Sequence, residues 1–574
     1  MPIFPKTLQH FGRSLGVAVL LSLTAAPSQA QGFAGPYLAA RIADAEGDFE
    51  ALVDYGTRAL IELPDNVGIM EGLLIAYMGL GDIEGGVPIA RRLDGLDDGN
   101  DMAALVLMAD AMEAGRWAEV DSALENGFSV GGYLDPLIQA WSAIGQGKMS
   151  DAISIFDTLT KDDQARQAAL FQKAIALAYV GDFEGAAFIL GGEVEPLNLN
   201  RPGIVAYAQV LSQLERNADA LEMIEATLPN VGDEEIETLR LELAAGKPIG
   251  FDAVKRPQDA LSALFFEVGQ ALAAEGQPSF VLIYSRISQH LNRQNIGAVL
   301  LTAALFENMG QHDLAVATYD QVSAGDLAYP QAMLGKAEAL RRDDLNEEAA
   351  EVLRALAQDF PDLAPVHVAL GDAMRFDEKY EEAVAAYDAA LALFEEPSAP
   401  QWVIYFARAI SLERLGQWPK AEADFRMALE LEPDQPAVLN YLGYSYVEKR
   451  ENLDEALEMI EKAVVARPGD AYITDSLGWV LYRLGRYEEA VVHMERAASL
   501  MPVDPVVNDH LGDVYYAVGR TLEAQFQWRR ALSFITEDTD VEEVKPDRIR
   551  RKLEVGLDVV LDEEGGDPIQ RAAE

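Results

Sequence analysis

Small residues recur at a fixed interval along the C-terminal third of the chain. One set of small residues is Gly478, Ala490 and Ala497. Each is followed, 34 positions later, by a residue of the same type, at Gly512, Ala524 and Ala531. A period of this length corresponds to a unit of two antiparallel helices, which cannot bury its apolar face alone and stacks on its neighbours. The chain is therefore expected to be all-α and to grow in one dimension without dividing into separate cores.

The residue types at these positions have physical reasons. Gly478 and Ala490 are placed where two helices cross closely, because a large side chain there would push the helices apart. Gly485 and Gly519 are placed in the turn between the helices, where a left-handed backbone favours glycine. Pro502 follows the second helix, which proline cannot continue.

The segment from Leu477 to Ala490 (LGWVLYRLGRYEEA) carries nearly the whole pattern. It resembles the tetratricopeptide repeat superfamily, most clearly over residues 328–534. The resemblance implies a right-handed superhelical solenoid whose concave face binds protein partners. The stretch from Leu439 to Leu532 also resembles proteobacterial exported repeat proteins, such as the periplasmic lipoprotein that partners carboxyl-terminal processing proteases. This chain has no cysteine, so it lacks the lipid attachment site of that relative.

Weaker matches to the same spacing extend through the N-terminal half and predict roughly thirteen or fourteen units. The predicted divisions are a degenerate N-terminal solenoid over 31–250, a clearer solenoid over 251–536, a capping helix within 537–561 and a disordered acidic tail over 562–574. The boundary near residue 250 rests on the acidic, then Gly- and Pro-containing stretch from Gly232 to Pro257, interpreted as a possible hinge. The capping helix, from Pro546 to Leu561, is expected because a terminal repeat cannot expose its apolar face.

The first thirty residues have the features of a secretory signal. Lys6 and Arg13 supply a positive region, an apolar stretch runs from Leu15 to Ala26, and small residues lead to Ala30. We expect cleavage after Ala30 and a mature chain in the periplasm or outside the cell. The apolar stretch is too short to span a bilayer comfortably, and no later segment is predicted to insert into a membrane.

The chain carries a formal charge of -50, from 95 acidic and 45 basic residues. Such a field repels nucleic acid phosphates and anionic lipids, so basic protein segments are the better electrostatic partners. The alternative is that the acidity only keeps a long molecule in solution. The absence of cysteine excludes disulfides, a cysteine nucleophile and thiolate metal ligands.

Two patterns invite an enzymatic or metal-binding interpretation, and neither has the context it needs. Gly127 to Gly131 (GFSVG) matches the G-x-S-x-G nucleophile motif, but that motif requires a preceding strand, and this stretch falls between helical pairs. The acidic run from Asp94 to Asp101 lacks the twelfth-position glutamate of a calcium loop, which leaves weak calcium binding as an open alternative. We therefore predict no catalytic residue, metal site, cofactor or small-molecule substrate.

The candidate binding site is the face formed by the first helix of each unit. By the resemblance, the positions three before, one after, and four and five after the small residue line the groove. They are Asn440, Tyr444, Val447 and Glu448 in one unit, Asp475, Trp479, Tyr482 and Arg483 in the next, and Asp509, Asp513, Tyr516 and Ala517 in the last. This mixture of aromatic, acidic and amide groups suits a peptide, with Trp479 as its anchor. The alternative is that Trp479 and Tyr482 pack against neighbouring helices.

A basic cluster near the C-terminus contrasts with the acidic chain. It consists of Arg548, Arg550, Arg551 and Lys552. We expect these side chains to pair with acidic residues of the last unit rather than to bind a partner.

Three functional hypotheses follow. The first is a non-enzymatic periplasmic scaffold or adaptor that binds protein or peptide partners, for a protease or for envelope assembly. The second is a self-associating structural component of the cell envelope. The third, an enzyme with an unrecognised site in the N-terminal half, has no motif to support it.

Overall fold

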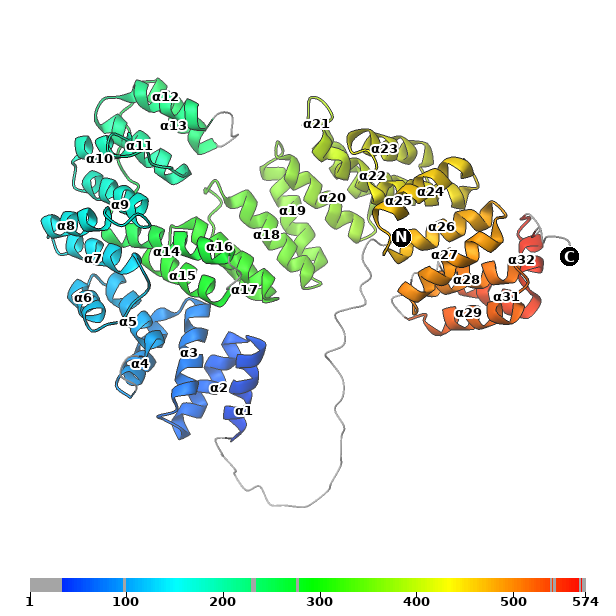
Figure 1. Ribbon diagram of the computed structural model, residues 1–574, viewed down its shortest axis with the longest axis horizontal. Helices are drawn as coiled ribbons and strands as arrows, with labels where there is room; N and C mark the ends of the chain where they lie inside the picture. Colours follow the sequence, from blue (N-terminus) through cyan, green and yellow to red (C-terminus); the bar gives the residue numbers. More distant parts are fainter. Residues whose placement is uncertain are drawn as a thin grey trace, which may run out of the picture. The chain divides into compact units, whose positions relative to one another are not determined.

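The computed structural model describes residues 34–96, 100–228, 234–274, 278–536, 539, 544–566 and 569 (Figure 1). Within these residues every regular element is helical, and no strand is present. The predicted signal sequence and most of the predicted C-terminal tail lie outside the described residues. The chain divides into two compact units, residues 1–305 (unit 1) and residues 306–574 (unit 2).

The helices of unit 1 are α1 (Ala34–Glu46), α2 (Phe49–Glu62), α3 (Val67–Leu80), α4 (Ile83–Asp94), α5 (Asp101–Glu113), α6 (Trp117–Glu125), α7 (Leu134–Gly145), α8 (Met149–Leu159), α9 (Arg166–Tyr179), α10 (Phe183–Leu190), α11 (Arg201–Gln213), α12 (Asn217–Thr227), α13 (Glu234–Ala244), α14 (Pro257–Ala274) and α15 (Pro278–Leu291). The division between the units falls within α16 (Ile296–Asn308).

The helices of unit 2 are α17 (His312–Tyr319), α18 (Tyr329–Arg342), α19 (Asn346–Asp359), α20 (Ala364–Phe376), α21 (Tyr380–Ala392), the short 3-10 helix η1 (Ala399–Gln401), α22 (Trp402–Arg414), α23 (Trp418–Leu431), α24 (Pro436–Lys449), α25 (Leu453–Ala466), α26 (Ala471–Arg483), α27 (Tyr487–Leu500), α28 (Pro505–Ala517), α29 (Thr521–Ser533), α31 (Pro546–Val555) and α32 (Leu557–Glu563).

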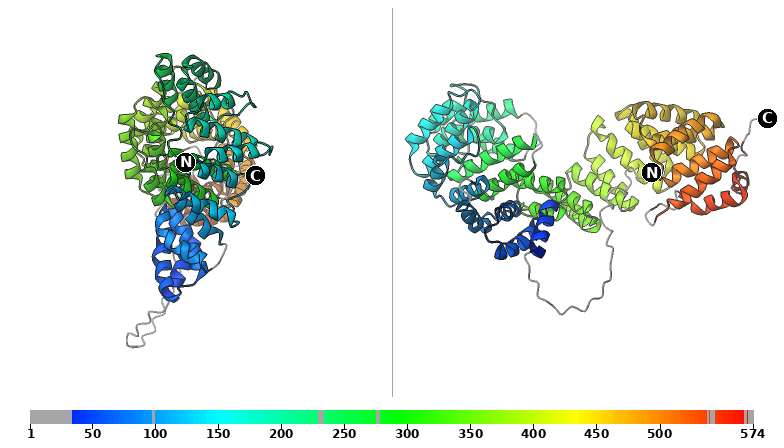
Figure 2. Two further views of the ribbon diagram at one scale, coloured as in Figure 1. Left: turned by 90° about the vertical axis from the view of Figure 1, so that its left-hand side faces the viewer. Right: turned by 60° about the horizontal axis from the view of Figure 1, so that its bottom comes forward.

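Successive helices form antiparallel pairs, and Figure 2 shows the same succession in two further views. We call the first helix of each pair the A helix and the second the B helix. Six pairs run from α1 to α12 and six from α18 to α29, with α14–α15 and α16–α17 between them. Within the described residues this agrees with the thirteen or fourteen units that the spacing predicts.

The A helices α26 and α28 cross their B helices at a glycine. A Cβ added to Gly478 would lie 2.7 Å from Met494 Cγ, and one added to Gly512 would lie 2.5 Å from Trp528 Cδ1. In the turn between the two helices, Gly485 has a φ of +76°, the left-handed conformation that glycine adopts without strain. The structure therefore confirms the reasons that the sequence suggested for these small residues.

The starts of the A helices also repeat. Asp470 and Asp504, one period apart, cap α26 and α28 by accepting hydrogen bonds from the backbone N–H groups of Ile473 (3.1 Å) and Val507 (2.9 Å). Such a side chain satisfies one of the N–H groups that lack a partner at a helix start. Local chemistry therefore defines where α26 and α28 begin.

The hairpin α14–α15 packs across the A helices of unit 1 (Figure 1). Its buried side chains Leu261, Phe265 and Ile287 belong to the same hydrophobic cluster as Trp141 of α7. The Arg286 guanidinium is also buried, and its Nε donates to the carbonyl of Gly79 at the end of α3 (2.9 Å). Burial lowers the pKa of Arg286 to about 10. These residues are more than a hundred positions apart, so the contact lies outside the nearest-neighbour pattern of a simple repeat array.

The segment that leads into this hairpin lies against α11. The backbone N–H of Ile249 donates to Ser212 Oγ (2.8 Å), and its carbonyl accepts from Gln213 Nε2 (2.6 Å). The side chain of Gln209 accepts from the backbone N–H of Asp252 (3.1 Å) and donates to the Asp252 carboxylate (2.7 Å). This part of the suggested hinge is therefore bound to unit 1, which extends to Leu305.

The C-terminal cap differs from the single helix that was expected over 546–561. Two short helices, α31 and α32, meet at Gly556, whose φ of +87° ends the first helix. The side chains of Ile549, Leu557 and Leu561 are buried in the hydrophobic cluster of the last repeats. The cap thus covers apolar surface as expected, but in two pieces.

None of the helices in the described residues combines the length and the apolar character needed to cross a membrane.

Replacing Gly512 by alanine should destabilise the last repeat by about 1–3 kcal/mol, because the added methyl group meets the rigid ring of Trp528. Urea unfolding followed by circular dichroism measures this loss. Gly469→Ala is the matched control, since a Cβ there has no atom within 4 Å. Equal stability of the two variants would contradict the close crossing.

Replacing Leu261 by alanine should destabilise unit 1 by about 2–4 kcal/mol, because its side chain is fully buried between the hairpin and the A helices. The same change at Leu241 of α13, which is 70% exposed, should have almost no effect. Thermal unfolding and limited proteolysis of the α14–α15 hairpin measure the difference. A hairpin that stays protected in Leu261→Ala would show that its packing on the A helices adds little stability.

Candidate functional site

One position of each A helix in unit 2 forms a row along the array. The residue five places after the small residue is Arg342 in α18, Phe376 in α20, Arg414 in α22, Glu448 in α24, Arg483 in α26 and Ala517 in α28. We call these six residues the A-helix row. The first four are exposed, Arg483 is half-buried and Ala517 is buried. We call the row open from α18 to α24, where its residues are exposed, and closed at α28, where its residue is buried.

Phe376 is the aromatic residue among these six, and 51% of the residue is exposed. The guanidinium groups of Arg341 and Arg375 lie 5.0 Å and 4.7 Å from its ring centroid. Arg341 also makes a bidentate contact with Glu338 (2.9 and 2.8 Å). The ring is thus held in place by its neighbours while part of its surface faces solvent.

The middle of the row is bridged by a tryptophan. Trp479 donates from Nε1 to Glu448 (2.7 Å), and Arg483 lies over its ring (4.7 Å) and 3.7 Å from Glu448. Tyr482 and His510 stack on Trp479, with centroids at 4.8 Å and 4.0 Å. Trp479 is only 5% exposed. In this structure it therefore joins neighbouring A helices, as the packing alternative supposed.

A buried charged pair lies beneath this stack. His510 Nδ1 is 2.9 Å from Asp475 Oδ2, and both residues are buried. Burial alone lowers the pKa of His510, but the Asp475 carboxylate outweighs burial and raises the pKa above its ordinary value. The charged imidazolium is consequently favoured at this contact.

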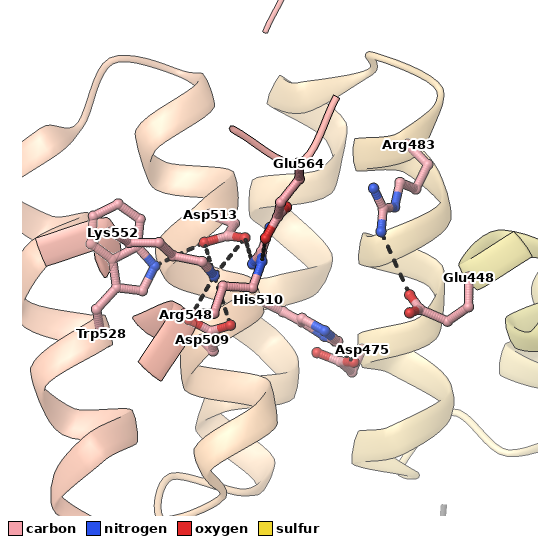
Figure 3. Close-up of polar contacts among 10 residues, drawn as sticks. All are labelled: Glu448, Asp475, Arg483, Asp509, His510, Asp513, Trp528, Arg548, Lys552 and Glu564. Atoms are coloured by element: carbon pink, nitrogen blue, oxygen red, sulfur yellow. Dashed lines mark hydrogen bonds and ion pairs between the residues drawn. The ribbon is translucent and has the colours of Figure 1, made fainter. Parts of the chain in front are cut away.

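The closed end of the row holds a lysine from the C-terminal cap. Lys552 of α31 is fully buried, and its ammonium lies 2.7 Å from Asp509 Oδ2 and 2.6 Å from Asp513 Oδ1 (Figure 3). Arg548, one helical turn earlier, lies 3.5 Å from Asp513 and pairs with Glu564 of the cap (2.8 Å). The expectation that the basic cluster pairs with acids of the last unit is confirmed for these two residues. Arg550 and Arg551 instead pair within the cap.

The two carboxylates at this end are not equivalent. Burial raises the pKa of Asp509, and the nearby Asp513 carboxylate acts in the same direction, against the Lys552 ammonium. Burial also acts on Asp513, but Lys552, Arg548 and the Trp528 N–H together lower its pKa below the ordinary value. The cap therefore neutralises a site that would otherwise hold two close negative charges.

The structure places the predicted groove residues in different environments. Those that are buried are Asn440, Val447, Asp475, Trp479, Tyr482, Asp509, Asp513 and Ala517, and those that are half-buried or exposed are Tyr444, Glu448, Arg483 and Tyr516. Tyr516 donates to Asp558 of α32 (3.1 Å). The sequence pattern did not single out Phe376, although counting five places from Gly371 finds it.

The patterns that suggested chemistry have structural roles. Ser129 donates to Asp135 (2.6 Å), and the same carboxylate accepts from the backbone N–H groups of Val130 and Gly131. This places Ser129 in the loop before α7, held by a carboxylate at the start of that helix. Within the described ranges, no group of three or more histidine, aspartate or glutamate residues is arranged to hold a metal ion.

The corresponding face of unit 1 is occupied by the chain itself. The α14–α15 hairpin lies on α3, α5 and α7, and the segment from Lys247 to Asp252 lies on α11 and α12. The A helices of unit 1 are therefore covered at these places, whereas the row in unit 2 is open from α18 to α24.

The family model described as "Tetratricopeptide repeat" matches residues 300–364, 406–471 and 446–505. A TPR repeat-containing protein of Pseudomonas aeruginosa is 30% identical over 173 residues, which are 30% of this chain and 28% of that protein. A lipoprotein NlpI homologue of Haemophilus influenzae is 33% identical over 84 residues, which are 15% of this chain and 26% of that protein. The matches thus span little more than a quarter of each relative.

Solved structures resemble the fold at low sequence identity. The Cut9–Hcn1 hetero-tetramer of the APC/C matches over 90% of this chain and 96% of its own, with 15% identity and a TM-score of 0.37. A tetratricopeptide repeat protein from Parabacteroides merdae matches over 45% of this chain and 97% of its own, with 14% identity and a TM-score of 0.36. Residues 300–364 and 406–505 of this chain thus match the tetratricopeptide repeat family, in a region whose helices are paired as described above.

Proposed function

We propose that the protein is a non-catalytic adaptor of the cell envelope that binds a segment of a partner protein on the open part of the A-helix row. Tetratricopeptide repeats generally serve protein–protein interaction, and that general role is the starting point. The particular face, the partner and the envelope location are the proposal.

The observation that carries the proposal is the change in exposure along one structural position. Residues at equivalent places on α18, α20, α22 and α24 are exposed, while the equivalent residue of α28, Ala517, is buried. The cap binds α28 at two other positions, Asp509 and Asp513, so this side of an A helix can hold a helix, and the open end offers a related surface to another segment. The half-buried Tyr444 lies one turn before Glu448 on this open part.

The side chains of the open part indicate what such a segment presents. Phe376 offers an aromatic surface flanked by two arginines, and Glu448 offers a carboxylate farther along the row. Interfaces bind most strongly where a few aromatic and arginine residues are held in place by packing. An extended or helical segment with an apolar anchor and a basic group beyond it fits this order.

The envelope location rests on the secretory features of residues 1–30 and on one relative. That relative, from Haemophilus influenzae, is named a lipoprotein homologue. The present chain has no cysteine, so lipid attachment through cysteine does not apply to it.

Replacing Phe376 by alanine should weaken partner binding at least tenfold, about 1.4 kcal/mol, because the exposed ring is the anchor. A photo-crosslinking amino acid at position 376, followed by mass spectrometry, identifies the partner, and calorimetry with the purified pair gives the affinities. The matched control is Phe526 of α29, a B-helix phenylalanine that is 63% exposed. Equal losses in Phe376→Ala and Phe526→Ala would remove the A-helix row from the proposal.

The mature protein should begin at Gln31 and appear in the periplasmic or secreted fraction. N-terminal sequencing after fractionation tests this expectation. Substituting Ala30 with a bulky residue such as phenylalanine should slow processing, because signal peptidases accept small residues there. An unprocessed chain in the cytoplasm would contradict the envelope location.

A further inference from the structure

The C-terminal cap has the chemistry of a bound ligand. Helix α31 places a lysine ammonium between two carboxylates of α28 at groove positions that correspond to Asn440 and Tyr444 in α24. Its arginine one turn earlier reaches the same carboxylate pair. The cap thus shows what this face accepts: a short basic helix with arginine and lysine four residues apart.

Several features distinguish α31–α32 from a permanent part of the array. Its helices have only 10 and 7 residues, lengths that do not form stable helices in water by themselves. Among the described residues no further helix pair packs on them, whereas each inner repeat is packed between two others. Short terminal segments of this kind open at lower free energy than the core.

Release of the cap would let water reach two carboxylates, and it would also expose the apolar surface that Ile549, Leu557 and Leu561 cover. Asp509 and Asp513 lie on the face of α28 and are buried because the cap covers them. Once uncovered, both carboxylates are hydrated, and their mutual repulsion favours any incoming cation. The formal charge of -50 on the whole chain acts in the same direction.

We propose that the Asp509–Asp513 pair is an exchangeable lysine-binding site, that α31–α32 is its resident occupant, and that a basic helix of the partner replaces it. The inference rests on the proposed function, in which a partner already lies on the adjoining open row. The partner's binding face, which ends at α24 in the proposed function, would be extended to α28 by this exchange. The partner segment presents an arginine and a lysine one helical turn apart, the spacing of Arg548 and Lys552.

A labelled peptide with the sequence of residues 544–566 tests the exchange directly. In the full-length mature chain, Lys552→Ala should loosen the resident helix, and the peptide should bind this variant at least tenfold more tightly than the unmodified chain. The matched control is Arg550→Ala on the same helix, because Arg550 is exposed and pairs with Asp547 of its own helix. Fluorescence anisotropy measures all three affinities.

The peptide itself provides a second control. A peptide that carries alanine in place of its own lysine at position 552 should bind at least tenfold more weakly. If the Lys552→Ala chain keeps its helicity and melting temperature but gains no affinity for the peptide, the site is not exchangeable and the proposal fails.

Hydrogen exchange on the unmodified chain gives an answer even if the Lys552→Ala variant does not fold. The amides of α31 and α32 should exchange at least tenfold faster than those of α26 and α28, and still faster when the peptide is in excess. Equal protection of α31 and α28 would overturn the proposal.

These measurements are independent of the test of the A-helix row. They need no natural partner and do not involve Phe376. A failed cross-link at Phe376 together with rapid peptide exchange would refute the proposed partner face and leave the lysine site standing. The reverse result would leave the partner face and refute the exchange.

Discussion

The close crossing of two helices at a single glycine is the contact on which the array depends. At Gly478 and Gly512 the B-helix side chains Met494 and Trp528 lie where a Cβ would be, so the two helices approach more closely than larger residues would permit. This approach fixes the angle of each pair and therefore the direction in which its A helix faces. The A-helix row exists because the same crossing repeats from α20 to α28, with alanine taking the place of glycine in α22.

The sequence predicted the features that depend on neighbours in the chain. The turn residue Gly485 acts within one repeat, and so do Pro502 and the aspartates at the starts of the A helices. A period of 34 was therefore enough to place the helix pairs and their turns. The sequence did not predict that α14–α15 returns to α3. It predicted that Lys552 pairs with acidic residues of the last unit, but not which residues of α28 bind it. Those contacts join residues that are not related by the 34-residue period. The α14–α15 hairpin, which makes the contact with α3, also resembles any other helix pair in sequence. The sequence also left open whether Trp479 is a groove anchor or packs against neighbouring helices, since a groove position gives no sign of what covers it.

The two units use the inner sides of their helix pairs differently. In unit 1 the chain supplies both an extended stretch, with Ile249 and Asp252 bound by the side chains of α11, and a hairpin that continues the hydrophobic cluster. In unit 2 it supplies only the short cap on α28. In this strongly acidic chain, two of the basic residues, Lys552 and Arg548, thus neutralise carboxylates of the chain's own last repeat.

A covalently tethered occupant competes at a high local concentration. For a segment joined by a short linker that concentration is on the order of millimolar, so a free helix at micromolar concentration would need roughly a thousandfold better affinity to displace α31. A partner that is already held at Phe376 is itself tethered, and its own basic helix then competes on nearly equal terms. The cap would in this way act as a threshold: single-site binders are rejected, and only a partner long enough to engage the array at two places gains entry.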